Sequence, residues 1–262
     1  HVEIKFSKYV PFLMVIDSLQ ARKFYGEKTS LTPNIDSLIK KGTYFENLIS
    51  TCDTSLLSLT SLFTGKHAFK TGIRSPRYNK LDHDIITYFQ ILKKSGYHLF
   101  AHRPSVEEAV GLMPTFENDD SDYFYHYDLS NGLGHQILDR LDSKLPEPWF
   151  FYTHHSDLHF PVDVPKEFDN EKFGTSKYER MISSIDSWVG KFAEKIDLQK
   201  TLFIITADHA TFVPYVDVND KVVSFEVDAK KHKISRKMQK KLPENLKTLR
   251  TKVFFALEKI RK

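Results

Sequence analysis

The stretch Val10-Pro-Phe-Leu-Met-Val-Ile-Asp17 decides the fold of this chain. It is an almost continuous apolar run, which is typical of a strand that is covered on both faces of a sheet. Three further short runs, rich in β-branched or aromatic residues, have the same character: residues 97–101, 149–153 and 201–206. We therefore expect four buried strands, the first of which is Val10–Ile16.

Helical patterns lie between these expected strands. One begins at Thr32-Pro33, where threonine can cap the helix and proline suits its first position, and ends at Gly42. Two more are expected over residues 81–95 and 176–196. Strands that alternate with helices predict an α/β fold, a mainly parallel central sheet with helices on both faces.

Composition excludes several classes of protein. Hydrophobic residues make up 40% of the 262 residues and charged residues 27%, which is a globular rather than a disordered mixture. The single cysteine, Cys52, excludes an internal disulfide and a zinc site built from cysteines. The sequence contains no run of 18 apolar residues that could span a membrane and no run that reads as a signal peptide. It does not indicate a compartment.

The positive charge gathers at the end of the chain. Residues 228–262 hold 13 lysines and arginines against 3 acidic residues, whereas the rest of the chain is mildly acidic. We expect a catalytic domain over residues 1–217 and a basic, helical tail over 218–262. A nucleic-acid partner is not expected, because the body lacks a basic surface. The tail is either a solvated helical face or a contact for an anionic surface.

Polar residues that can bind metals follow the expected strands. In an open parallel sheet, ligands bind outside the carboxyl ends of the strands. Asp17 follows the first strand directly, and Asp208-His209 follow the last. Asp17 is either the cap of a turn or a hard ligand for a divalent cation. A mixture of aspartate and histidine suits zinc or manganese, whereas imidazole serves calcium poorly.

The segment from Thr51 to Gly65 brings a hydroxyl group to the start of an expected helix near Ser55. The free backbone N–H groups at such a start can bind an anion. Ser55 is then either the cap of the helix or a nucleophile. A serine hydroxyl is weak at its ordinary pKa and needs a metal ion or a base before it can attack.

Six segments together resemble the sulfatase branch of the alkaline phosphatase superfamily. They are Val15-Ile-Asp-Ser-Leu19, Thr32-Pro-Asn-Ile-Asp-Ser-Leu38, Gly42-Thr-Tyr-Phe-Glu-Asn47, Ser58-Leu-Thr-Ser-Leu-Phe-Thr-Gly65, Phe151-Tyr-Thr-His-His-Ser-Asp-Leu-His-Phe-Pro161 and Thr206-Ala-Asp-His209. The resemblance covers residues 10–212. It implies one or two divalent ions, of zinc, manganese or calcium, held by Asp17, Ser55, Asp208 and His209. Ser55 falls at the nucleophile's position, and His159 at that of a histidine near the ester oxygen. His154 is expected to be structural.

Several residues depart from the family pattern. The signal that converts a cysteine or serine to formylglycine needs a following proline and arginine, but Leu57 and Leu59 stand there. Ser18 replaces the second aspartate of the usual pair, and Ala210 replaces the glycine after Asp-His. The family's Gly-Lys segment is not recognisable, and Arg103 is the candidate to bind the anion in its place. Compared with the family, the C-terminal subdomain is expected to be shortened or absent.

The sequence thus predicts a metal-dependent hydrolase of sulfate or phosphate esters, with a hydroxyl nucleophile rather than formylglycine. The substrate is expected to be a small molecule or a glycan ester. Two alternatives remain open. One is a catalytically degenerate member that binds an anionic glycan or a lipid head group. The other is a transferase for phospho-alcohol groups. The substituted Ser18 and Ala210 favour the degenerate member, whereas the presence of Ser55, His159 and the metal-ligand candidates favours the enzyme.

Overall fold

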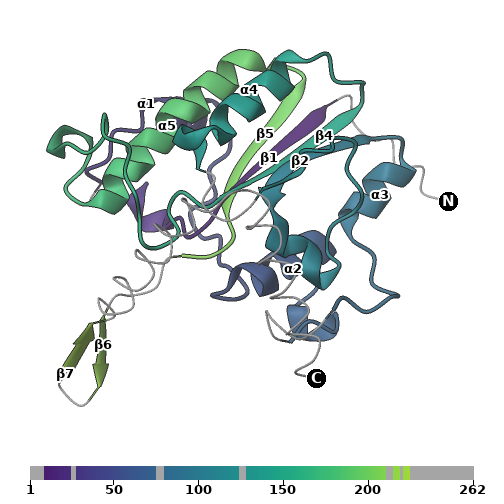
Figure 1. Ribbon diagram of the computed structural model, residues 1–262, viewed down its shortest axis with the longest axis horizontal. Coiled ribbons are helices and arrows are strands. Elements are labelled where there is room, and N and C mark those ends of the chain that lie inside the picture. The colour runs from purple at the N-terminus through teal and green to yellow at the C-terminus, as the bar shows by residue number, and fades with distance from the viewer. Residues whose placement is uncertain are drawn as a thin grey trace, which may run out of the picture.

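The computed structural model describes residues 9–24, 28–74, 80–123, 128–210, 215–218 and 221–224. Within these ranges the chain forms a parallel five-stranded sheet with strand order β3-β2-β4-β1-β5 (Figure 1). Its strands are β1 (Val10–Ile16), β2 (His98–Pro104), β3 (Asp122–Tyr123), β4 (Trp149–His155) and β5 (Thr201–Ala207). The predicted α/β class and parallel sheet are confirmed.

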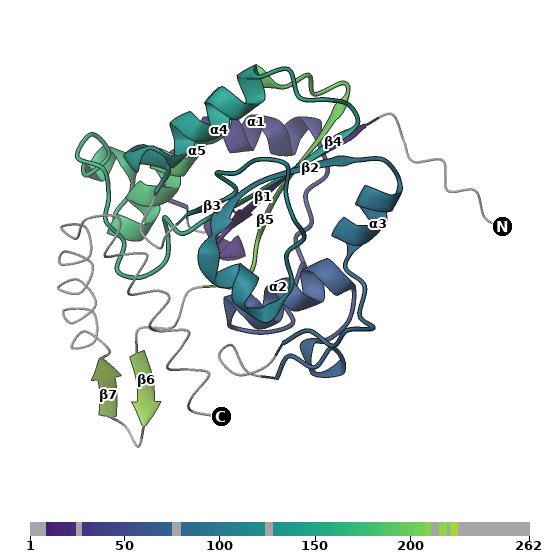
Figure 2. The same ribbon diagram turned by 45° about the vertical axis from the view of Figure 1, so that its right-hand side comes forward.

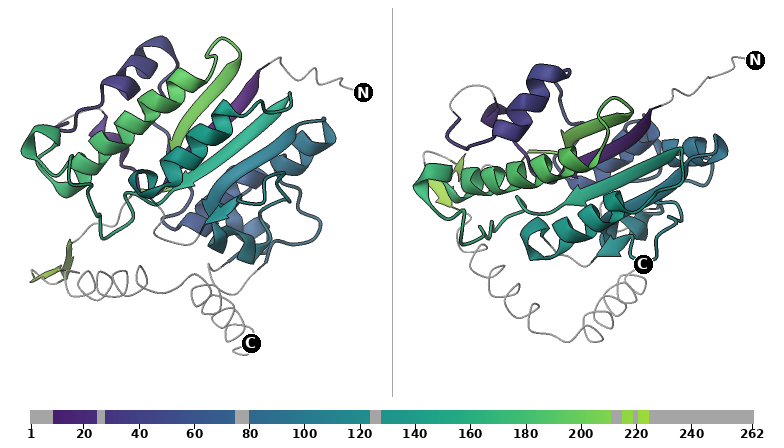
Figure 3. Two further views of the ribbon diagram at one scale, coloured as in Figure 1. Left: turned by 45° about the horizontal axis from the view of Figure 1, so that its top comes forward. Right: turned by 90° about the horizontal axis from the view of Figure 1, so that it is seen from above.

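Helices cover both faces of the sheet (Figures 1 and 3). On one face lie α1 (Pro33–Lys41), α4 (Leu133–Asp142) and α5 (Lys177–Lys195), and on the other lie α2 (Ser55–Thr64) and α3 (Tyr88–Lys94). Side chains of β1 alternate between the two cores: Phe12 and Met14 pack with α5, whereas Leu13 and Val15 pack with α2. Because both faces are covered, the strand reads as a continuous apolar run.

Short elements complete the described part of the chain. The 3-10 helices are η1 (Ala21–Lys23), η2 (Ala68–Lys70), η3 (Ser105–Val110), η4 (Leu129–Asn131) and η5 (Glu171–Phe173). Strands β6 (Tyr215–Val218) and β7 (Lys221–Ser224) form a separate antiparallel hairpin (Figure 2). The tail was predicted as helical over residues 218–262, but β7 lies in its first part, and the rest beyond residue 224 lies outside the described residues. Among the helices that are described, none is both long and apolar enough to cross a membrane.

The helix predicted over residues 81–95 is wrong in its first half. The structure has a helix only from Tyr88 to Lys94. The backbone N–H of Leu81 donates to the carbonyl of Val110, and that of Asp82 donates to Thr71, both at 2.9 Å. These bonds tie residues 81–82 to neighbouring loops, so the helix begins only after Thr87, which forms a capping box with Gln90.

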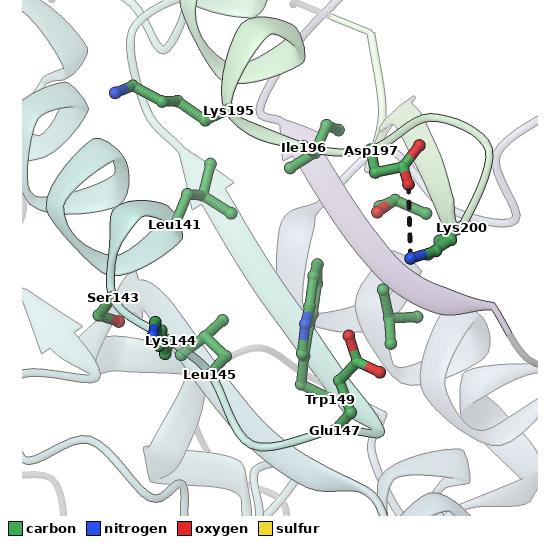
Figure 4. Close-up of a pocket in the computed structure, with 12 residues that line it drawn as sticks. Leu141, Ser143, Lys144, Leu145, Glu147, Trp149, Lys195, Ile196, Asp197 and Lys200 are labelled. Carbon is green, nitrogen blue, oxygen red and sulfur yellow. Dashed lines mark ion pairs between the residues drawn. The ribbon is translucent and has the colours of Figure 1, made fainter.

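A cavity of about 430 Å³ lies between the ends of α4 and α5 (Figure 4). Val10, Trp149 and Thr201, which begin β1, β4 and β5, help to line it. Lys200 and Asp197, which form an ion pair at 3.9 Å, also line it. The cavity is therefore at the amino edge of the sheet, opposite the edge where Asp17 and Asp208 follow their strands.

Candidate metal and nucleophile site

Three residues meet at the carboxyl edge of the sheet because of strand register. β1 lies between β4 and β5, with Val15 opposite His154 on one side and Thr206 on the other. Side chains alternate along a strand, so His154, Asp17 and Asp208 all point to the face that α2 covers. One ligand atom from each lies within 4.8 Å of the others, and all three residues are buried.

Ser18 orients both carboxylates through an unusual backbone conformation. Its φ is +65°, and it is the one residue other than glycine with a positive φ in the described part of the chain. From there its backbone N–H donates to Asp208 Oδ1 at 3.1 Å and its hydroxyl donates to Asp17 Oδ1 at 2.6 Å. The Tyr178 hydroxyl donates to the Ser18 carbonyl at 2.6 Å. Strained non-glycine residues of this kind persist where surrounding contacts fix them.

Ser55 is the first residue of α2 and faces Asp17 and His209, two of the predicted metal ligands. Figure 2 shows α2 below the strands. Its Oγ lies 3.1 Å from His209 Nε2 and 3.4 Å from Asp17 Oδ2. His209 Nδ1 lies 2.8 Å from the Ala210 carbonyl, which can only accept, so Nδ1 carries a proton. In neutral His209, Nε2 is then the acceptor, and the Ser55 hydroxyl can donate to it.

Two serines, Ser58 of α2 and Ser50 in the loop that precedes it, are hydrogen-bonded to the residue that follows β5. Ser50 Oγ donates to the Asp208 carbonyl at 2.7 Å, and Ser58 Oγ donates to the same oxygen. Asp208 Oδ1 also accepts from the backbone N–H of His209 at 2.7 Å. These contacts fix the Asp208 carboxylate relative to Ser55.

His154 is the residue that sequence reasoning placed outside the site. Its Nε2 lies 3.8 Å from Asp208 Oδ2, and its Nδ1 is hydrogen-bonded to the buried carboxylate of Glu107. Burial lowers the pKa of His154, but the charge and hydrogen bond of Glu107, with Asp208 and Asp17, raise it to about 9. His155, which points to the opposite face, has a pKa lowered to about 3 by burial and by the charges of His154 and His102.

The donor atoms at this site fit a divalent cation. Within the described residues, His154 Nε2 and Asp208 Oδ2 are both buried and have no hydrogen-bond partner. An unpartnered buried polar atom is costly, and a cation between them would satisfy both. Two carboxylates and an imidazole are ligands for zinc or manganese rather than for calcium.

Two other predicted residues, His159 and Arg103, have contacts with residues outside this group. His159 Nδ1 is hydrogen-bonded to the Phe160 carbonyl at 3.0 Å, within its own turn. The buried guanidinium of Arg103 donates to Glu108 at 2.9 Å and lies over the ring of Phe116. A proton donor at His159 and an anion contact at Arg103 thus stay predictions.

The family model described as Sulfatase matches residues 12–235. No curated protein sequence matches the chain.

Solved structures share the fold at low sequence identity. A putative sulfatase from Bacteroides thetaiotaomicron is 16% identical with a TM-score of 0.62, over 83% of this chain and 63% of its own. A 2-O GAG sulfatase is also 16% identical with a TM-score of 0.61, over 83% and 63%. The phosphonate monoester hydrolase of Agrobacterium radiobacter is 14% identical with a TM-score of 0.62, over 77% and 62%. The chain therefore spans a little less than two thirds of each.

Proposed function

The chain belongs to the sulfatase family, and from this premise we propose that it is a metal-dependent hydrolase of sulfate or phosphate esters whose nucleophile is the Ser55 hydroxyl. The observation that carries this proposal is the position of Ser55. Its Oγ lies at the start of α2, 3.1 Å from His209 Nε2 and next to the carboxylate of Asp17.

The residues present support a nucleophilic step at Ser55. The free N–H groups in the first turn of α2 attract the anionic ester and hold it beside the hydroxyl. Ser55 gives its proton to His209 Nε2 as its Oγ bonds to sulfur or phosphorus, and the bond to the alcohol oxygen breaks. The leaving oxygen then takes a proton, for which His159 is the predicted donor. Water afterwards releases sulfate or phosphate from Ser55.

A divalent cation fits between Asp17 and Asp208. When bound, it would stabilise the negative charge that develops on the ester oxygens. The sequence also assigned Ser55 and His209 to the metal. His209 Nε2 lies 3.1 Å from Ser55 Oγ, and its single lone pair can accept the proton of that hydroxyl or bind a metal ion, but not both at once. In this proposal it accepts the proton.

An unmodified hydroxyl favours phosphate chemistry within this proposal. The residues after Ser55 are leucines where the formylglycine signal needs proline and arginine. Two structures with a similar fold support a glycan as the molecule that bears the ester group. One is a 2-O GAG sulfatase, and another was solved in complex with k-i-k-neocarrahexaose. We propose a phosphorylated or sulfated glycan, or a small ester, as the substrate.

The test compares Ser55→Ala with Ser61→Ala, which changes a serine further along the same helix. Each protein is loaded with zinc or manganese, its metal content is measured, and it is assayed with nitrophenyl phosphate, nitrophenyl sulfate and sulfated glycan fragments. We expect Ser55→Ala to lose turnover by orders of magnitude and to keep its metal, and Ser61→Ala to keep both.

Two outcomes would contradict the proposal. Turnover that survives in Ser55→Ala would show that water, and not the serine, attacks the ester. Metal-loaded wild-type protein that turns over none of these esters but binds the glycan would favour the degenerate family member.

A further inference from the structure

Two imidazoles flank the unpartnered oxygen of Asp208. His209 Nε2 is 3.4 Å from Oδ2, and His154 Nε2 is 3.8 Å from the same atom. Only one of them is already engaged with the nucleophile, because Ser55 Oγ lies 3.1 Å from His209 Nε2. The two rings therefore face the same carboxylate with different surroundings.

The surroundings of His154 hold its ring in one orientation. Its Nδ1 is hydrogen-bonded to the carboxylate of Glu107, a residue that is only 1% exposed. The Tyr152 hydroxyl lies 3.2 and 3.3 Å from the two oxygens of Glu107, which fixes that carboxylate in turn. With Nδ1 held in this way, Nε2 is left to face Asp17 and Asp208.

This arrangement has the features of a metal-binding histidine with an outer carboxylate. Such a carboxylate accepts the hydrogen bond of one ring nitrogen, sets the orientation of the ring and makes the other nitrogen a better donor to the metal. Glu107 comes from η3, directly after β2, and so reaches the ring from outside the elements that carry Asp17 and Asp208.

We propose that His154 is the imidazole ligand of the metal centre and that Glu107 is a positioning residue that presents His154 Nε2 to the ion. This inference rests on the proposed function for one premise, a divalent ion between Asp17 and Asp208. It adds a ligand that sequence reasoning did not assign, and it leaves His209 available to Ser55. It also predicts that the centre binds zinc or manganese in preference to calcium.

The experiment measures metal binding directly. Wild-type protein and variants are freed of metal with a chelator and titrated calorimetrically with Zn²⁺, Mn²⁺ and Ca²⁺. Co²⁺ is added separately, because its visible absorption reports the ligands around it. The test variants are His154→Asn and Glu107→Gln. The matched controls are His98→Asn and Glu117→Gln. These two residues form a half-exposed pair in which His98 Nδ1 also contacts a carboxylate, at 2.9 Å.

We expect tighter binding of Zn²⁺ or Mn²⁺ than of Ca²⁺ in the wild type. Glu107→Gln should weaken Zn²⁺ binding by about 10- to 100-fold and alter the Co²⁺ spectrum, because loss of an outer carboxylate has effects of that size. His154→Asn should weaken Zn²⁺ binding more than Glu107→Gln does. The two surface controls should bind like the wild type.

Unchanged Zn²⁺ affinity in both His154→Asn and Glu107→Gln would overturn the inference, as would a wild-type protein that binds none of the metals. Tyr152→Phe covers the case in which Glu107→Gln does not fold. It keeps Glu107 and His154 and removes the hydroxyl that donates to the Glu107 carboxylate. A several-fold loss of Zn²⁺ affinity in Tyr152→Phe supports the positioning role, and an unchanged affinity contradicts it.

Failure of this inference and failure of the proposed function are distinguishable. If the wild type hydrolyses esters and His154→Asn keeps its Zn²⁺, the ligand assignment is wrong and the function stands. If Zn²⁺ binding depends on His154 and Glu107 but no ester is turned over, the ligand assignment stands and the function is wrong.

Discussion

Glu179 lies in the first turn of α5, and its replacement by glutamine removes a buried negative charge from the helix that carries Tyr178. Its carboxylate accepts hydrogen bonds from Thr175 Oγ1 at 2.6 Å, from the backbone N–H of Ser176 at 3.2 Å and from Lys23 Nζ at 3.0 Å. Burial raises the pKa of Glu179, but hydrogen bonds from the side chains of Thr175, Lys23, Thr29 and Ser176 lower it to about 2.

This lowered pKa sets the size and the pH dependence of the effect. The ordinary value is 4.5, so the shift of the pKa to about 2 corresponds to roughly 3 kcal/mol of folding free energy. Because the pKa is lower in the folded state, this contribution is complete at neutral pH, above the unfolded pKa. It is lost as the pH falls from about 5 to 2.

The assay is urea unfolding of wild-type protein and Glu179→Gln at pH 7, 4 and 3. We expect Glu179→Gln to be less stable by roughly 3 kcal/mol at pH 7, and the difference to fall to about half of that near pH 3. Glu171→Gln, at an exposed glutamate of η5, is the matched control and should change little at any pH. A difference between wild type and Glu179→Gln that stays constant from pH 7 to 3 would refute the reasoning, because the charge would then not be its cause.

Three further changes test other contacts. Gly134→Ala would place a Cβ 2.5 Å from the ring of Trp188, and we expect about 1–3 kcal/mol of destabilisation in urea unfolding. Tyr178→Phe removes the hydroxyl that donates to the Ser18 carbonyl. We expect a loss of about 1 kcal/mol in urea unfolding and weaker Zn²⁺ binding by calorimetry. Asp208→Ala should remove the bound metal, measured by elemental analysis, and abolish ester turnover; a variant with full metal content would contradict the site.

The fold was largely predictable because its strands are covered on both faces. β1 begins and ends where the apolar run Val10–Ile16 does. The helix start at Pro33 was equally readable, since proline is favoured at a first helical position. α4 was missed, because Gly132 and Gly134 at its start weaken the local preference for a helix. Residues 81–87 were misassigned, because their pattern does not reveal the loops that bind their backbone.

The site was predictable only where its residues follow a strand or begin a helix. Asp17, Asp208 and Ser55 occupy such positions, and the structure brings them together. His154 directly follows the predicted run 149–153, but it was expected to be structural. β4 extends to His155, and its pairing with β1 places His154 on the same face as Asp17. The signal that could have found it was this position at the end of a predicted strand, the same signal that indicated Asp17. Glu107 has no such signal, because its contact with His154 spans 47 positions along the chain.

Ser18 shows why a missing ligand in the sequence is weak grounds for a degenerate site. An aspartate at this position would add a third carboxylate beside Asp17 and Asp208, where a buried negative charge is costly without a cation. The serine instead donates its hydroxyl proton to Asp17 and its backbone N–H to Asp208. If His154 supplies the further metal ligand, one hard carboxylate has been replaced by an imidazole. The change then concerns which metal binds and does not imply that binding is lost.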